Sequence, residues 1–171
     1  MKKNPEVEIE TDVGRFKIEL FPEDAPETVE NFLNYVNSGF YNGLIFHLII
    51  PNYIVQGGGF DKNLNYVIPI FQPIKNEADN RLKNKKGTVA MARTTEINSA
   101  TSQFFINLKD NPNLDFEERT PESFGYTVFG KVKEGFDVVE KIGKIPVKTM
   151  KGYESIPIKP VQMINVKVVN Q

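Results

Sequence analysis

Alternation of apolar and polar residues with a period of two constrains this chain more than any other feature of its sequence. The pattern is clearest over residues 7–11 and 16–20, on either side of the short turn Asp12-Val13-Gly14. Because successive side chains of a strand point to opposite faces, this alternation predicts two half-buried strands joined as a hairpin. Further strands are expected at residues 88–92, 103–107, 126–132 and 161–169.

Only two segments follow a helical period instead. In the first, Pro26 stands where a first helical turn would begin, and Asp24 and Glu27 have the spacing of a capping box. Asn31 is expected on the solvent side of this helix. The second helix is short and rests on four apolar residues, Val138, Val139, Ile142 and Ile145. Many short strands with few helices favour a β-sandwich or a β-barrel, and periodicity alone does not choose between them.

Residues 44–60 form the most unusual stretch of the chain. A continuous apolar run over residues 44–50 is long enough for a buried strand, and Pro51-Asn52 breaks it. A second apolar run then ends in Gln56 and three glycines. A polar amide beside backbone without side chains lets another chain approach closely. We expect this stretch to face a second one, residues 99–107, across a groove.

Composition excludes several classes of function. The length of 171 residues suits one domain, which we place at residues 1–171. The 21 Lys and Arg balance 22 Asp and Glu, so a net charge of −1 gives no reason to expect nucleic acid or an anionic membrane as partner. With no cysteine and one histidine, the chain lacks a thiolate nucleophile and the ligands of a thiolate or multi-histidine metal site.

The first residues bear on the compartment. Met1-Lys2-Lys3 resembles the charged start of a signal peptide, but no apolar segment follows it. No run of the sequence approaches a transmembrane length. We therefore expect a cytoplasmic protein, or a periplasmic one if the sequence is a mature form without its signal.

Residues 61–86 differ from the rest because they show no clear period. They are polar and irregular, contain Pro69 and Pro73, and end in a charged patch. We interpret them as a long surface excursion rather than as a separate functional site.

Several segments of the chain also occur, in the same order, in one protein family. They are Phe46-His47 and residues 56–60, 74–78, 87–94, 99–107 and 128–132. Through them the sequence resembles the bacterial cyclophilins, which are peptidyl-prolyl cis-trans isomerases, over residues 7–169. The resemblance implies an all-β fold, a closed antiparallel cyclophilin-like β-barrel capped by two α-helices, one at each end.

The activity that this resemblance implies is rotation about X–Pro peptide bonds, which assists protein folding. The barrier is about 20 kcal/mol. Because no bond breaks, the reaction needs no cofactor. Donors aimed at the proline nitrogen and the carbonyl oxygen stabilise the twisted bond more than the planar one. The implied partners are proline-containing peptides and unfolded or flexible protein segments, bound by a monomer.

The resemblance also implies where the substrate binds. The residues fall into an apolar pocket for the proline ring (Tyr53, Ile54, Phe105, Leu114), amides for the substrate backbone (Gln56, Gln103) and a rim and mouth (Ala92, Arg93, Thr94, Asn113, Tyr126). Relatives have an aromatic residue, often tryptophan, at the position of Asn113, and it contacts cyclosporin. Only weak cyclosporin binding is therefore expected.

One departure from the family concerns the chemistry. Relatives have an arginine directly after Phe-His, the donor thought to reach the proline nitrogen, and this chain has Leu48. Position 48 belongs with Tyr53 and Gln56 to the expected catalytic group. Loss of one preorganised donor predicts turnover slower by about a hundred- to a thousandfold. Arg93 is a rival donor if its side chain swings inward.

Two functions stay open from the sequence. The otherwise intact pocket favours an isomerase with reduced turnover. Leu48 favours a module on the cyclophilin barrel that binds proline peptides or client chains with little or no isomerase activity.

His47 is expected to be a structural residue beneath the groove with its hydrogen bonds satisfied, because this chemistry needs no base. A hydrolase that uses Ser102 and His47 is disfavoured, since the sequence around Ser102 is no nucleophile elbow.

Overall fold

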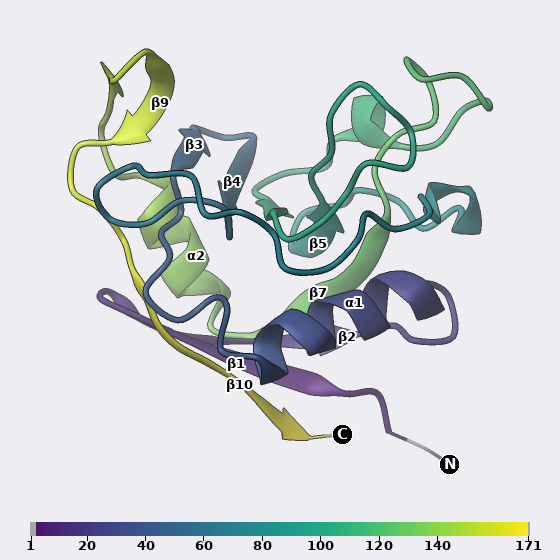
Figure 1. The fold of residues 1–171 in the computed structure, drawn as a ribbon, viewed down its shortest axis with the longest axis horizontal. Helices are drawn as coiled ribbons and strands as arrows, with labels where there is room; N and C mark the ends of the chain where they lie inside the picture. The colour runs from purple at the N-terminus through teal and green to yellow at the C-terminus, as the bar shows by residue number, and fades with distance from the viewer. Residues whose placement is uncertain (1–2, 171) are drawn as a thin grey trace.

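Strands make up much of the chain, as the alternation predicted (Figure 1). The computed structural model describes residues 3–170. Its strands are β1 (Glu6–Thr11), β2 (Gly14–Leu20), β3 (Leu48–Ile50), β4 (Ile54–Gly57), β5 (Thr88–Met91), β6 (Phe104–Asn107), β7 (Val128–Glu134), β8 (Val147–Met150), β9 (Tyr153–Pro157) and β10 (Met163–Asn170). The helices are α1 (Pro26–Asn37), α2 (Phe136–Gly143) and the short 3-10 turns η1 (Ala78–Asn80) and η2 (Pro112–Leu114).

Eight of these strands form one antiparallel sheet in the order β10-β1-β2-β7-β5-β6-β4-β3. β1 and β2 pair as the predicted hairpin, with Val7 opposite Ile18 and Ile9 opposite Phe16. These four side chains are all buried. The period of two therefore identified both the hairpin and the face that it turns to the core.

The sheet curls until its two edges meet. The segment just before edge strand β3 is hydrogen-bonded to the start of the other edge strand, β10, and to the residues before it. Just before β3, the N–H of Gly43 donates to the carbonyl of Met163 at 2.7 Å. The N–H of Met163 in turn donates to the carbonyl of Leu44 at 2.7 Å, and the N–H of Phe46 donates to that of Val161 at 3.1 Å. These bonds close the barrel that the family resemblance implied. The fold is therefore a β-barrel and not the β-sandwich that periodicity had left open.

The two helices cover the barrel from different sides. α1 contacts β10, whereas α2 contacts β2, β3 and β4. Phe32 of α1 enters an aromatic cluster in the core, with its ring centroid 5.3 Å from that of Phe104 and 5.1 Å from that of Phe129. Val139 and Ile142 of α2 are fully buried. No helix within residues 3–170 is both long and apolar enough to cross a membrane.

The start of α1 differs from the prediction. Its N-cap residue is Ala25 rather than Asp24, so the expected capping box does not form. The carboxylate of Glu77, far along the chain, takes this role. It accepts hydrogen bonds from the N–H of Thr28 at 2.8 Å, the hydroxyl of Thr28 at 2.7 Å and the N–H of Glu27 at 3.3 Å. A negative charge at this end also complements the helix dipole.

Asn31 faces the interior rather than solvent, contrary to the prediction. It is buried, and its side-chain amide donates to the carbonyl of Thr101 at 2.8 Å. That carbonyl lies just before β6, so Asn31 connects α1 to one of the predicted groove stretches. The polar character of the side chain concealed this contact from an analysis of periodicity.

The hairpin of β8 and β9 was not predicted. The two strands pair antiparallel, with Val147 opposite Pro157 and Met150 opposite Tyr153. Their turn has a positive φ at both central residues, 52° at Lys151 and 81° at Gly152, which suits a two-residue hairpin turn. Lysine is not a usual signal for that geometry, and the two short strands show little alternation.

Candidate active site

The two unusual stretches of the sequence lie side by side in the sheet. Gln56 on β4 and Phe105 on β6 are cross-strand partners. β5 pairs with the other edge of β6, where Ala90 lies opposite Phe105. The Nε2 atom of Gln56 donates to Oε1 of Gln103 at 3.1 Å. The structure therefore brings together the two glutamines that the sequence placed on facing stretches.

Beside this pair lies an apolar pocket of about 160 Å³. Phe105 is only 2% exposed, and the ring of Tyr126 stands edge-on to it with 5.6 Å between the ring centroids. The residues around the cavity are Tyr53, Ile54, Gln56, Ala92, Arg93, Phe105, Leu114 and Tyr126. Predicted residues from separate parts of the chain thus surround one small, largely apolar space.

Two further hollows adjoin this pocket. The first, of about 250 Å³, shares Gln56, Ala92 and Arg93 with it and is also lined by Gln103 and by Thr94, Ser99, Thr101, Tyr66 and Pro69. The second is larger, about 590 Å³, and lies beyond Arg93 and Tyr126. Most of the residues that line it have polar or charged side chains, and its acidic residues form no metal-ligand cluster within the described part of the chain. The small apolar pocket is therefore the one suited to a proline ring.

Asn113 lies at the mouth between these spaces. It lines the larger hollow, and its Nδ2 atom donates to the hydroxyl of Tyr53 at 2.8 Å. This bond links the two walls of the mouth. Thr94 on the opposite rim is fixed by Ser99, because its N–H and its hydroxyl both lie 2.9 Å from the Oγ atom of Ser99.

Leu48 lies next to the pocket and offers it no donor. It is the first residue of β3 and the cross-strand partner of Gln56. Its side chain packs in the apolar cluster that contains Tyr53, Ile54 and Phe105. The position where relatives have an arginine therefore contributes apolar surface instead.

Arg93 lines the pocket and is held on its rim by backbone carbonyls. All three guanidinium nitrogens donate, at 3.0 to 3.3 Å, to the backbone carbonyls of Gly125, Thr94, Glu96 and Pro121. The guanidinium carbon also lies 5.0 Å from the centroid of the Tyr126 ring, within the range of a cation–π contact. An inward swing of Arg93 would break four charge-assisted hydrogen bonds.

The glycines after Gln56 make room for this chain itself. A Cβ atom on Gly59 would come within 2.6 Å of the side chain of Gln103. A Cβ atom on Gly58, which has a φ of +92°, would come 3.0 Å from the carbonyl oxygen of Ser102. The space that the sequence analysis assigned to another chain is filled by the segment before β6.

His47 and Ser102 do not form a base and nucleophile pair. The buried hydroxyl of Ser102 donates to the carbonyl of Gly58 at 2.8 Å. His47 is buried as predicted, with its ring centroid 4.4 Å from that of Phe60. Its hydrogen bonds are not satisfied, however, since Nδ1 has no partner among residues 3–170. Burial lowers the pKa of His47 to about 4, so the ring is neutral at pH 7.

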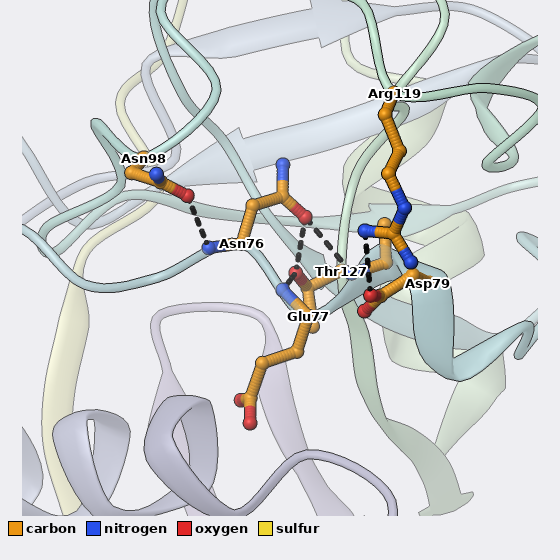
Figure 2. A network of polar contacts seen from close by, with 7 residues as sticks. Asn76, Glu77, Asp79, Asn98, Arg119 and Thr127 are labelled. Atoms are coloured by element: carbon orange, nitrogen blue, oxygen red, sulfur yellow. Dashed lines mark hydrogen bonds and ion pairs between the residues drawn. The ribbon is translucent and has the colours of Figure 1, made fainter.

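Sequence reasoning missed a buried polar network behind the pocket, shown in Figure 2. Asn76 lies within the presumed surface excursion, yet it is buried. Its Nδ2 atom donates to the carbonyl of Gly125 at 3.1 Å, and its Oδ1 atom accepts from the hydroxyl of Thr127 at 2.9 Å. The carbonyl of Gly125 also binds Nε of Arg93. Asn76 therefore fixes the chain on both sides of Tyr126, a wall of the pocket.

The same network reaches two other parts of the molecule (Figure 2). The N–H of Asn76 donates to Oδ1 of Asn98 at 2.9 Å, and the N–H of Glu77 donates to the hydroxyl of Thr127 at 2.8 Å. Because the carboxylate of Glu77 caps α1, the network joins this helix to the pocket wall. Only the family segment at residues 74–78 marked this region in the sequence.

The sequence matches one protein family over most of its length. The sequence model of the family described as "Cyclophilin type peptidyl-prolyl cis-trans isomerase/CLD" matches residues 6–168. The chain is 48% identical over 162 residues to peptidyl-prolyl cis-trans isomerase cyp18 of Streptomyces antibioticus, covering 95% of this chain and 97% of the relative. It is 44% identical to peptidyl-prolyl cis-trans isomerase B of Escherichia coli strain K12, covering 95% and 98%.

The fold matches solved structures over a similar extent. A crystal structure of a Cryptosporidium parvum cyclophilin type peptidyl-prolyl cis-trans isomerase, in the presence of the dipeptide Ala-Pro, has a TM-score of 0.77. It is 27% identical and covers 97% of this chain and 99% of that one. Sequence and fold thus agree over nearly the whole length. The chain belongs to the cyclophilin-type peptidyl-prolyl cis-trans isomerases.

Proposed function

We propose that this isomerase binds the proline ring of its substrate in the apolar pocket beside β4, β5 and β6. The observation that carries the proposal is the cavity of about 160 Å³ lined mainly by apolar side chains, with Gln56 in its lining and Gln103 hydrogen-bonded to Gln56. The related C. parvum structure was determined with a proline dipeptide, which supports a substrate of this kind. The substrates are proline-containing peptides and unfolded or flexible protein segments.

Within the pocket, the ring would be held while the preceding carbonyl turns. Phe105 and Leu114 supply apolar surface for the ring, and Tyr53 and Ile54 flank it. The amides of Gln56 and Gln103 carry four N–H groups, and the bond between them uses one. We expect the remaining N–H groups to donate to the substrate carbonyl. A donor to the proline nitrogen favours the twisted bond because loss of amide resonance leaves the nitrogen lone pair more basic, and donors to the carbonyl oxygen hold that oxygen while the bond turns.

Turnover by this site is reduced because Leu48 supplies no donor for the proline nitrogen. Arg93 is tied to four carbonyls and stays on the rim. The transition-state stabilisation that one preorganised donor supplies, about 3–4 kcal/mol, is therefore lost. Binding of the ring depends on apolar contact and should survive. The groove residues all come from one chain, so this function requires no second subunit.

An amide chemical-shift titration with an X–Pro peptide tests the binding site. We expect the largest shifts at residues that line the groove, which are Tyr53, Gln56, Ala92, Gln103 and Phe105. The control is the same peptide with alanine in place of proline, which should cause much smaller shifts. Shifts confined to residues 61–86, or equal shifts with both peptides, would place the binding site elsewhere.

A further inference from the structure

An apolar surface strip lies outside the proline pocket. The exposed fractions of its side chains are 54% for Tyr66, 76% for Ile68, 55% for Ile70 and 39% for Phe71. Single exposed apolar residues are ordinary on protein surfaces, but four within six consecutive residues are a concentration of the kind found at interaction sites. We refer to these four residues as the apolar strip.

The backbone of the strip is fixed at both ends. The ring of Tyr66 packs against Phe60, with 5.6 Å between the centroids. At the other end, the ring of Phe71 packs against Tyr35 at 4.9 Å, and the N–H of Phe71 donates to the hydroxyl of Tyr35 at 3.2 Å. Between these anchors, Ile68 and Ile70 are presented to solvent on an ordered backbone. A ligand that binds there needs to order little of the protein.

The strip is continuous with the substrate groove. Tyr66 and Pro69 line the hollow of about 250 Å³ beside the glutamine pair. That hollow shares Gln56, Ala92 and Arg93 with the proline pocket. A peptide that leaves the pocket through this hollow passes the glutamine pair and reaches the strip at Tyr66 and Pro69, on the far side of the hollow's polar residues.

We infer that the apolar strip binds apolar side chains of the substrate chain itself, in the residues that flank the proline held in the pocket. The inference rests on the proposed function of the groove. Residues 66–71 contain no charged side chain, so recognition comes from burial of apolar surface rather than from charge. The preferred substrates are X–Pro bonds set among large apolar residues, as in chain segments that are buried once a client protein has folded.

Peptide affinities measured by calorimetry test this inference. Three peptides share an Ala-Ala-Pro-Ala core, which is left unextended, flanked by two leucines on each side, or flanked by two serines on each side. They are titrated into the wild type, the double variant Ile68→Ser/Ile70→Ser, and Ile164→Ser. Ile164 is a matched control because it is 49% exposed on β10 and does not line the groove.

The wild type and Ile164→Ser should bind the leucine peptide about five- to tenfold more tightly than the serine peptide. The double variant should lose this preference while it binds the short peptide as the wild type does. A preference that persists in the double variant, or is absent from the wild type, overturns the inference alone. A wild type that binds none of the peptides overturns the proposed function and this inference together. A wild-type dimer in sedimentation velocity that the double variant cannot form would assign the strip to a second copy of the chain and overturn the inference.

Discussion

Burial places the only histidine of the sequence in a site that disfavours its charged form. His47 is surrounded by the core beside Phe60, and no group within residues 3–170 accepts or donates at its Nδ1 atom. Removal of the ring from water lowers its pKa from 6.5 to about 4. The folded protein therefore keeps His47 neutral at a pH where the unfolded chain already protonates it.

Stability should consequently fall as the pH is lowered from about 6.5 towards 4. In this window the unfolded chain binds a proton that the folded protein excludes, so protonation favours unfolding. Across this pH window the free energy of unfolding should fall by about 3 kcal/mol. Urea unfolding curves at a series of pH values measure it, with His47→Gln as the variant that cannot titrate there. An equally steep loss of stability in His47→Gln would assign the dependence to other groups.

We expect Asn113 to control cyclosporin binding, a second property at the scale of one side chain. It offers less apolar area than the aromatic residue of the relatives, and its side-chain amide donates a hydrogen bond to the hydroxyl of Tyr53. We expect weak cyclosporin binding by the wild type and about tenfold tighter binding by Asn113→Trp, which adds an apolar ring and an N–H donor. Asn113→Leu separates the two contributions, because it adds apolar area without the donor. No gain in Asn113→Trp, measured by fluorescence titration, would contradict this placement of Asn113.

At the scale of elements, helix α1 depends on a residue that is distant in the sequence. Glu77 satisfies the N–H groups of Glu27 and Thr28 and the hydroxyl of Thr28. Its own position is fixed by the hydrogen bond from its N–H to the Thr127 hydroxyl. The start of α1 and the wall of the pocket are thus stabilised by the same segment.

Substitution of this cap should destabilise the protein, whereas substitution of the residue that the sequence suggested should not. We expect Glu77→Ala to lower the free energy of unfolding by about 2 kcal/mol, since it leaves buried donors without an acceptor. Asp24→Ala, the matched control, should change it by less than about 0.5 kcal/mol. Chemical denaturation of both variants measures the difference. A larger loss of stability in Asp24→Ala than in Glu77→Ala would show that the capping box predicted from the sequence forms after all.

Local pattern explains which elements could be predicted from the sequence. The β1–β2 hairpin and both α-helices show their period within a few residues, so they were found. The cap at Glu77 and the contact of Asn31 with Thr101 join residues that are 49 and 70 positions apart, and no local pattern encodes such pairs. The β8–β9 hairpin was not predicted because its turn, Lys151-Gly152, has a lysine with a positive φ, and lysine is not a usual signal for such a turn.

At the scale of the whole molecule, the pocket exists only because the sheet curls. Its lining runs from Tyr53 to Tyr126 along the chain, and closure occurs elsewhere, where residues 43–46 meet residues 161–163. Periodicity could not distinguish this barrel from a sandwich, so the family resemblance supplied both the closure and the grouping of the pocket residues. Neither source revealed that Arg93 is tied to four carbonyls, because its partners lie in loops with no repeating pattern.

We propose that Leu48 is the residue that limits catalysis in this arrangement. Leu48 lies beside the pocket as the cross-strand partner of Gln56. Arg93, the cationic residue of the pocket lining, is hydrogen-bonded to backbone carbonyls on the rim. The isomerase should therefore bind proline peptides well and turn them over slowly. A donor introduced at position 48 should act on the rate more than on affinity, because it contacts mainly the twisted state.

The most direct test is the rate of isomerisation of a short X–Pro peptide by the wild type, Leu48→Arg, Leu48→Met and Arg93→Ala in a protease-coupled assay. We expect kcat/KM to be low in the wild type, unchanged in Leu48→Met, and raised by about a hundredfold in Leu48→Arg. Arg93→Ala should change it by less than about tenfold, through a loosened pocket wall. A fast wild type that loses its activity in Arg93→Ala and gains nothing in Leu48→Arg would show that Arg93 is the donor and would contradict the account.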